Sequence, residues 1–240
     1  NWGLSALFHD LNGDQHPELY VCNDFSFSED QAYFSRQGRQ FQSFSPFSIR
    51  NMSLSAMAVD AADIDRDGDQ DLFVVEMLSR DPASRQRQRA NATALRQMHP
   101  DVTNPASTPE MLRNTLFLNR DDNTFAEIAQ FSGLEATEWS WGVAFIDVDL
   151  DGWEDCLITN GNYHDVIDAD AMNRLKQVKE DDSIESGLKN LNLFPRLETA
   201  NLAFRNLGNL RFKDASSEWG FDTEAVSHGI AHGDLDNDGD

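Results

Sequence analysis

The sequence predicts an all-β protein built from a repeated four-stranded unit. Three observations support this prediction: an acidic motif recurs along the chain, short runs of apolar and β-branched residues flank it, and a pair of Phe-containing runs follows at a distance. Self-similarity at long, regular intervals is typical of repeat architectures. Short β-branched and aromatic runs bounded by Gly, Asn and Asp predict strands. Each unit is therefore expected to read strand, acidic loop, strand, connection, strand, turn, strand.

The acidic motif occurs three times in full and once in part. The copies read DLNGDQHPE from Asp10, DIDRDGDQD from Asp63, DVDLDGWED from Asp147 and DLDNDGD from Asp234, where the sequence ends. All four carry an oxygen-bearing side chain at motif positions 1, 3 and 5. The three complete copies also carry an acid at position 9. The acids therefore recur at the same offsets in each copy.

The strands predicted around these loops define the organisation of the chain. The complete motifs are followed by LYVCN, LFVVE and CLITN, and the Phe-containing pairs span Tyr33–Phe41, Leu116–Phe125 and Ala203–Phe212. Four short strands repeated in series are typical of propeller blades. We therefore expect part of one β-propeller domain, with about three four-stranded blades and the start of a fourth. The expected units are residues 1–54, 55–139, 140–226 and the truncated 227–240.

Two connections, residues 77–113 and 161–200, are long enough to be insertions, and both are predicted to be partly helical. A helix is expected from about Pro82 to Met98, capped by Asp81, and another from about Ala169 to Lys179, capped by Asp168. A further helix is expected after Ser183. Both insertions follow the second strand of their unit. They should therefore emerge together at the end of the blades opposite the acidic loops.

The two insertions differ in charge. The first is basic, and its arginines are Arg80, Arg85, Arg87, Arg89 and Arg96. The second is acidic, with Asp165, Asp168, Asp170, Glu180, Asp181 and Asp182. The arginines are interpreted either as a solvated helix face with internal ion pairs or as a contact for an anion or partner. Opposite charge predicts that the two insertions pack together into a cap.

The acidic loops have the donor pattern of a calcium site. Oxygen side chains at alternate positions, with a backbone carbonyl at position 7, suit an ion that takes six to eight oxygen ligands. An EF-hand would need Glu at position 12, but Val21, Val74 and Ile158 stand there, so the ligand set closes at position 9. Solvated acidic turns explain any single loop, whereas repetition favours ion binding. Zinc is disfavoured because no sulfur or imidazole joins the set. Magnesium is the alternative ion, although it usually takes fewer protein ligands and more water.

We accordingly predict Ca²⁺ in three complete loops and in a fourth, truncated one. The position-7 residues would contribute their carbonyl groups. The predicted metal-site residues are Asp10, Asn12, Asp14, His16 and Glu18; Asp63, Asp65, Asp67, Asp69 and Asp71; Asp147, Asp149, Asp151, Trp153 and Asp155; and Asp234, Asp236, Asp238 and Asp240. In the first loop Gln15 replaces the Gly of the other copies at position 6, with Gly13 two places earlier, which makes an altered geometry an expectation for that loop.

These residues resemble the FG-GAP/VCBS repeat family, which includes the integrin alpha-chain propeller. The resemblance rests on AVDAADIDRDGDQDLFVVEML (Ala58–Leu78), WGVAFIDVDLDGWEDCLITNG (Trp141–Gly161) and GIAHGDLDNDGD (Gly229–Asp240). The order of insertions and repeats is most similar to the cartilage acidic protein-like (ASPIC/UnbV) group. The resemblance implies a calcium-binding propeller of six to eight blades, extracellular or periplasmic, with a binding or adhesion role.

Composition narrows the function classes. The formal charge of −23 argues against nucleic-acid binding, which needs basic surface. No apolar run of about 18 residues predicts a membrane span. The two cysteines, Cys22 and Cys156, are expected to be buried thiols. The sequence starts without Met and ends inside a motif, so we expect a fragment of a longer protein, with its leader not visible.

The expected function is a secreted binding or adhesion module whose calcium is structural, with a protein or glycan ligand on the insertion face. No catalytic motif is found, so no catalytic residue is predicted. The alternative is an accessory or catalytic propeller of an enzyme acting on an extracellular polymer. For that alternative, the local candidates are His164, Asp165 and Asp168. Trp139, Trp141 and Trp153 are interpreted as a cluster near the third loop that serves blade packing.

Overall fold

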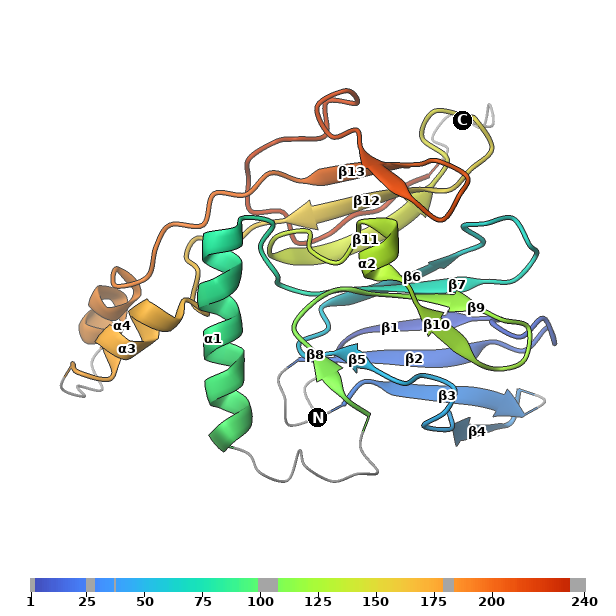
Figure 1. Ribbon diagram of the computed structural model, residues 1–240, viewed down its shortest axis with the longest axis horizontal. Coiled ribbons are helices and arrows are strands. Elements are labelled where there is room, and N and C mark those ends of the chain that lie inside the picture. The colour runs from blue at the N-terminus through green and yellow to red at the C-terminus, as the bar shows by residue number, and fades with distance from the viewer. Residues whose placement is uncertain (1–2, 25–28, 37, 99–107, 179–183, 234–240) are drawn as a thin grey trace.

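Three four-stranded antiparallel sheets form the body of the protein (Figure 1). The computed structural model describes residues 3–24, 29–36, 38–98, 108–178 and 184–233. In each sheet the strands lie side by side in chain order. The first sheet contains β1 (Gly3–His9), β2 (Glu18–Asn23), β3 (Gln31–Arg36) and β4 (Gln40–Ser43). The second contains β6 (Ala58–Ala62), β7 (Asp71–Val75), β9 (Thr115–Asn119) and β10 (Phe125–Glu127). The third contains β11 (Ser140–Ile146), β12 (Asp155–Asn160), β13 (Leu202–Asn206) and β14 (Phe212–Asp214).

This architecture confirms the predicted all-β repeat of four-stranded antiparallel units. The acidic loops join the first and second strands of each sheet, as predicted. A short parallel pair, β5 (Met52–Ser53) with β8 (Glu110–Met111), lies outside the three sheets.

Residues 3–233, with the gaps given above, form no closed ring. Of the expected fourth unit, residues 227–233 contain no strand, and Asp234, Asp236, Asp238 and Asp240 lie outside the described residues.

Apolar side chains between neighbouring sheets form the core. One cluster joins the first and second sheets, around Tyr20, Leu72 and Phe117. Another joins the second and third sheets, where the rings of Phe73 and Phe145 lie 6.1 Å apart. Every residue of β7 is buried, because its sheet is covered on both faces. A strand covered on both faces needs a continuous apolar run, and the sequence DLFVV supplies one after its first residue.

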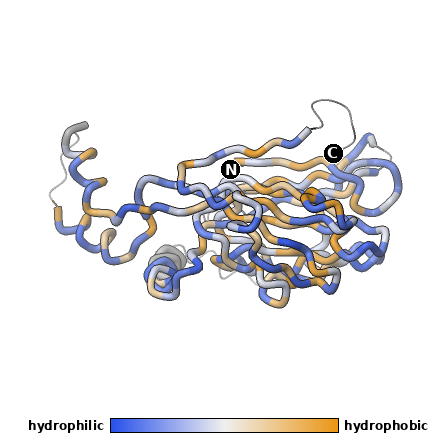
Figure 2. The backbone as a smooth tube through the Cα atoms, turned by 90° about the horizontal axis from the view of Figure 1, so that it is seen from above, coloured by the Kyte–Doolittle hydropathy of each residue, from blue (hydrophilic) through white to orange (hydrophobic). Residues whose placement is uncertain are grey.

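The two insertions leave the sheets at the end opposite the acidic loops (Figures 1 and 2). They carry α1 (Pro82–Met98), α3 (Ala169–Leu175) and α4 (Ile184–Leu191), while the single-turn α2 (Ala129–Ser132) follows β10. Helix α1 contacts α3, which confirms that the insertions are neighbours. Asp81 Oδ2 accepts a hydrogen bond from the Ser84 N–H at 2.7 Å. The expected helix from Ala169 ends at Leu175, not near Lys179.

Candidate metal sites

The three complete acidic loops have the same hydrogen-bonded frame. The position-1 carboxylate accepts the N–H groups of positions 5 and 6 at 2.7–3.1 Å in every copy. The position-5 carboxylate accepts the N–H of position 7 at 2.9–3.0 Å. These bonds curl the backbone around its own carboxylates. The position-1 residues are Asp10, Asp63 and Asp147, the position-5 residues Asp14, Asp67 and Asp151, and the position-7 residues His16, Asp69 and Trp153.

The frame needs two residues in the left-handed region, at positions 4 and 6. In the first loop these are Gly13 (φ 71°) and Gln15 (φ 67°). In the second they are Arg66 (φ 61°) and Gly68 (φ 101°), and in the third Leu150 and Gly152, at 58° and 90°. Each loop thus has one glycine and one strained non-glycine residue. The first loop was expected to differ in geometry, but it has the same backbone conformation as the others. Its glycine stands at position 4 instead of position 6, and both positions are left-handed in all three loops.

The position-9 acids Glu18, Asp71 and Asp155 are buried at the start of the second strand. One oxygen accepts the N–H of position 2 at 2.9–3.1 Å, and the other accepts an N–H from the third strand at 2.8–3.1 Å. Burial raises the pKa of Asp71 to about 7 and that of Asp155 to about 6, and it also raises the pKa of Glu18. A nearby cation would offset this cost of carrying charge.

The residues of the second and third loops fit a hard cation. Carboxylate oxygens of Asp63, Asp65 and Asp71 lie within 4.8 Å of one another, as do those of Asp147, Asp149 and Asp151. Asp65 Oδ1 is buried without a hydrogen-bond partner, which is costly for a carboxylate unless a cation contacts it. In the first loop position 3 is Asn12, whose amide donates to Glu18 Oε1 at 3.4 Å. That loop therefore presents one charge fewer.

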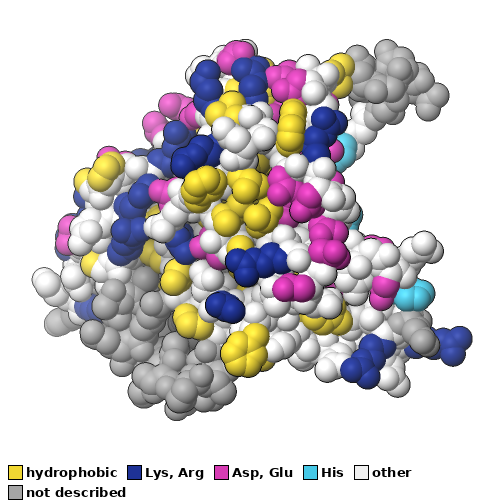
Figure 3. Space-filling view, turned by 45° about the vertical axis from the view of Figure 1, so that its right-hand side comes forward, with side chains coloured by type: hydrophobic (Ala, Val, Ile, Leu, Met, Phe, Trp, Pro, Cys, Tyr) yellow, Lys and Arg dark blue, Asp and Glu magenta, His cyan; other side chains and the backbone are white. Residues whose placement is uncertain are grey.

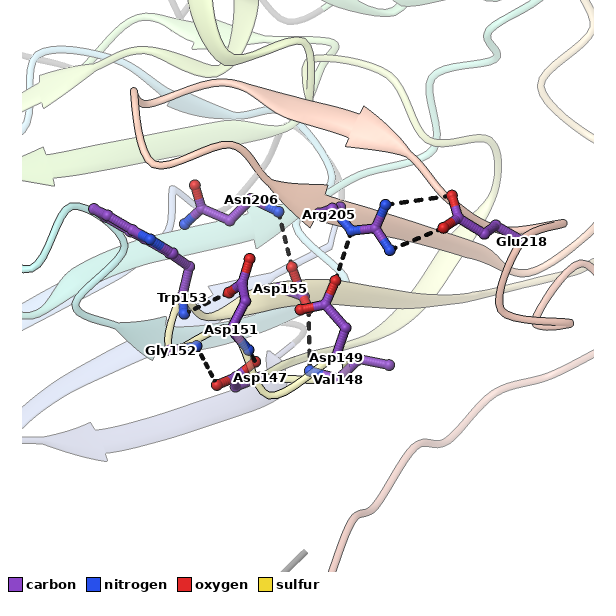
Figure 4. A network of polar contacts seen from close by, with 10 residues as sticks. All are labelled: Asp147, Val148, Asp149, Asp151, Gly152, Trp153, Asp155, Arg205, Asn206 and Glu218. Carbon is purple, nitrogen blue, oxygen red and sulfur yellow. Dashed lines mark hydrogen bonds and ion pairs between the residues drawn. The ribbon is translucent and has the colours of Figure 1, made fainter.

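The third loop is tied to β13 and to the turn that follows β14 (Figure 4). Arg205 Nε donates to Asp149 Oδ2 at 2.7 Å, and Arg205 Nη2 contacts Glu218 Oε1 at 3.0 Å. The guanidinium of Arg66, from the second loop, lies 5.1 Å from the ring centre of Trp153. The two loops are consequently in contact across the boundary between sheets.

Two asparagines at this end of the sheets are functional candidates that sequence reasoning missed. Asn119 and Asn206 end the third strands, and their N–H groups are the ones that reach Asp71 and Asp155. Their side-chain amides also reach the preceding sheet: Asn119 Nδ2 donates to Leu11 O at 2.7 Å, and Asn206 Nδ2 to Ile64 O at 2.8 Å. The available signal was the shared Asn in LFLN and AFRN.

A family model described as FG-GAP-like repeat matches residues 10–74 and 103–158, together just over half of the chain. The chain belongs to the FG-GAP-like repeat family. No curated protein matches it. The matched residues include all three complete acidic loops and extend into β12 as far as Ile158. The family match therefore covers the segments that share the hydrogen-bonded frame. Closeness to the ASPIC/UnbV group stays a prediction.

Three of the five arginines of the basic insertion have acidic partners within the chain, and the side chain of Arg96 lies outside the described residues. Arg80, Arg85 and Arg87 form ion pairs with Asp214, Glu135 and Asp168. Internal ion pairs therefore explain these three arginines. Cys22 and Cys156 are buried free thiols, as predicted.

The predicted tryptophan cluster is wrong. Trp153 lies in the third loop, but Trp139 packs with Met57 and Met77 near the insertions, and Trp141 Nε1 donates to Gly161 O there. Strand β11 runs from one end of the sheet to the other, so residues close in sequence are separated by its length. Packing by Trp139 agrees with the structural interpretation of that residue.

The candidates for the enzymatic alternative hold the second insertion together. Asp168 caps α3, accepting the Ala171 N–H at 2.8 Å, and also pairs with Arg87. Asp165 is buried, which raises its pKa to about 6. His164 Nδ1 lies 3.3 Å from Phe194 O. Among the described residues, no helix combines the length and apolar character needed to cross a lipid bilayer.

Proposed function

We propose that this chain is a calcium-binding propeller module that presents a ligand surface, with the ions in a structural role. The observation that carries the proposal is the threefold repetition of one carboxylate frame with buried position-9 acids. Turn-forming acidic loops would not need three carboxylates converging within 4.8 Å, as they do in the second and third loops. The oxygen-only donor set favours calcium over zinc.

Calcium would act by neutralising carboxylates that otherwise repel. In the second loop burial and, after it, the neighbouring acids Asp67 and Asp63 raise the pKa of Asp65, as expected for a carboxylate whose charge is not compensated. An ion bound there would fix the turn between the first two strands and, through the position-9 acid, the third strand. We propose an extracellular or periplasmic location, where modules with modest calcium affinity can fill.

A groove at the opposite end is the proposed ligand surface. It has a volume of about 400 Å³ and lies where the second insertion leaves and rejoins the third sheet. Tyr163 is 67% exposed beside it, with polar neighbours suited to a protein or glycan. Its other lining residues are Asn162, Arg196, Leu197, Glu198, Glu224, Ala225 and Val226.

Melting curves test the metal assignment. Excess EGTA should lower the Tm of the chain, and calcium should restore it better than magnesium, because an ion that binds only the folded state stabilises it by about 2.7 kcal/mol at 100 times its Kd. An unchanged Tm in EGTA would contradict the proposal.

Asp149→Ala should weaken calcium binding more than Asn12→Ala, because it removes a charge as well as a ligand. Isothermal titration gives the comparison. Glu218→Ala is the matched control, since it removes the other partner of Arg205 without touching a loop oxygen. Equal effects of Asp149→Ala and Glu218→Ala would show that the ion pair, not the metal, explains the loss.

Ligand binding can be tested separately from metal binding. Tyr163→Ala should abolish binding on a glycan or protein array and leave calcium binding intact. Phe131→Ala, another exposed aromatic at 49% exposure, is the control at a different site. We propose no catalysis, and a polymer-degradation assay distinguishes this from the enzymatic alternative. Retained binding by both variants would overturn the placement of the surface.

A further inference from the structure

The metal loops are joined by a continuous chain of hydrogen bonds across the sheet boundaries. Glu18 accepts the N–H of Leu11, and the Leu11 carbonyl accepts the amide of Asn119. The N–H of Asn119 then reaches Asp71 in the second loop. The pattern repeats from Asp71 through Ile64 and Asn206 to Asp155. All these bonds are 2.7–3.1 Å long. Each run of three bonds connects one position-9 acid to the position-9 acid of the next loop.

Both asparagines are buried and use all their polar groups. Asn206 is 2% exposed and Asn119 is 6% exposed. Their amides donate a second bond within their own sheet, Asn206 to Glu154 O at 3.2 Å and Asn119 to Gln70 O at 3.0 Å. Their Oδ1 atoms accept backbone N–H groups of the following turn at 2.8–3.3 Å. The side-chain amide of Asn119 makes four hydrogen bonds and that of Asn206 makes three, so neither can move with one loop without displacing the other.

We propose that Asn119 and Asn206 couple neighbouring metal loops, so that ordering one loop raises the affinity of the next. This inference rests on the proposed calcium binding. Each asparagine is a positioning residue: its N–H holds the position-9 acid of its own loop, and its side chain holds the position-2 peptide of the preceding loop. An ion that orders the preceding loop therefore orders the partner of the next acid.

The first sheet supplies an internal reference for the test. Ser35 stands at the equivalent position, and its N–H reaches Glu18 at 3.1 Å. A short side chain is thus compatible with the bond to the position-9 acid. Asn206→Ser should keep the Asp155 contact and remove the bond to Ile64. Asn119→Ser is the matched control, because it breaks the same bond between the first and second loops only.

A double-mutant cycle measures the coupling. Asp65→Ala should inactivate the second loop by removing one converging carboxylate, while the hydrogen bonds accepted by Asp63, Asp67 and Asp71 stay in place. Occupancy of the third loop is read from terbium luminescence sensitised by Trp153. Asp65→Ala should raise the terbium Kd of the third loop about two- to tenfold, the range expected for one or two net hydrogen bonds. In the Asn206→Ser chain this effect should disappear, and in the Asn119→Ser chain it should persist.

The outcomes separate coupling from a purely structural role. A structural role of Asn206 would lower the Tm equally in EGTA and in calcium, whereas coupling lowers the calcium-dependent gain in Tm. If Asp65→Ala raises the terbium Kd of the third loop equally in the unaltered chain and in the Asn206→Ser chain, the coupling is wrong but the proposed calcium binding still stands. Failure of the unaltered chain to bind terbium or calcium overturns the proposed function, and the coupling with it.

Discussion

Two buried carboxyl groups at the insertion end show how single residues depend on their surroundings. Asp30 accepts bonds from the Tyr20 hydroxyl and the Asn23 N–H, both at 2.8 Å. Burial nevertheless raises its pKa to about 7. Glu76 is completely buried and neither carboxylate oxygen makes a hydrogen bond of good geometry. Burial and the nearby acids Asp24 and Asp30 raise its pKa well above the ordinary range. Both groups favour the protonated form.

Asp30→Asn should flatten the pH dependence of stability. Between pH 4 and pH 7 the folded chain keeps a proton on Asp30 that the unfolded chain has released, since the unfolded pKa is near 3.8. The free energy of unfolding therefore falls as pH rises through this range, by at most about 1.4 kcal/mol per pH unit for this group.

Urea unfolding in EGTA at pH 5 and pH 7.5 measures this slope. Asp30→Asn should reduce the difference between the two pH values, because Asn carries no titrating proton. The exposed Asp170, changed to Asn, is the control and should leave the slope unchanged. Identical slopes for Asp30→Asn and the unaltered chain would show that Asp30 is not protonated in the fold.

At the scale of elements, one residue links the two insertions. Asp168 is 2% exposed, and its two oxygens serve different helices: Oδ1 caps α3, and Oδ2 accepts Arg87 Nε of α1 at 2.7 Å. Asp165 and Gln88, from the second and first insertions, are buried nearby. The contact between α1 and α3 is thus polar at its centre, and its geometry depends on the cap.

Asp168→Ala should destabilise the chain by about 1–3 kcal/mol, because it removes a helix cap, leaves the buried N–H of Ala171 without its acceptor and breaks the ion pair with Arg87. Asp168→Asn should cost less, since it keeps the cap oxygen. Chemical denaturation measures the loss, and limited proteolysis should show earlier cleavage within residues 161–200. Asp170→Ala is the control. Calcium affinity should not change, and a parallel loss of calcium binding would contradict the separation of the two ends.

For the whole molecule, the uncovered face of the first sheet is the main feature. Leu4 and Phe8 of β1 and Phe41 of β4 are 49%, 59% and 49% exposed, and Phe47, in the turn after β4, is 75% exposed. The Phe8 and Phe41 rings meet edge to face at 6.2 Å. Among the described residues, the second sheet packs against a neighbouring sheet on both faces, whereas the first sheet does so on one face. Large apolar side chains left in water and open strand edges favour association.

The 240-residue chain should therefore self-associate. Phe8→Ser combined with Phe41→Ser should shift the distribution toward monomer in light scattering after size exclusion. Phe131→Ser, at 49% exposure on α2, is the control and should have little effect. A monodisperse, cooperatively melting monomer of the unaltered chain at all concentrations would contradict this prediction. Figure 3 shows hydrophobic and basic side chains among the acidic ones on one face of the molecule.

Local sequence determined the repeats, the loops and the helix starts. The acids of the loops bind backbone groups within a few residues, and Asp81 and Asp168 cap helices that begin at the next residue. Because these hydrogen bonds join residues only a few positions apart, the sequence pattern itself predicts them. The strand order was also predictable, because each strand pairs with its predecessor around short turns or insertions.

Only the tertiary structure decided which of these residues act across the sheets. Asn119 and Asn206 are ordinary strand-end residues in the sequence, and their partners Leu11 and Ile64 are 108 and 142 residues away. The first loop has its glycine at position 4 (Gly13) and a non-glycine residue at position 6 (Gln15), the reverse of the other two loops. The loop conformation is the same because both positions adopt the left-handed conformation in every loop. The raised pKa of Asp71 likewise comes from burial between packed sheets. Burial and contacts between sheets depend on how distant segments pack, which the pattern along a single strand does not encode.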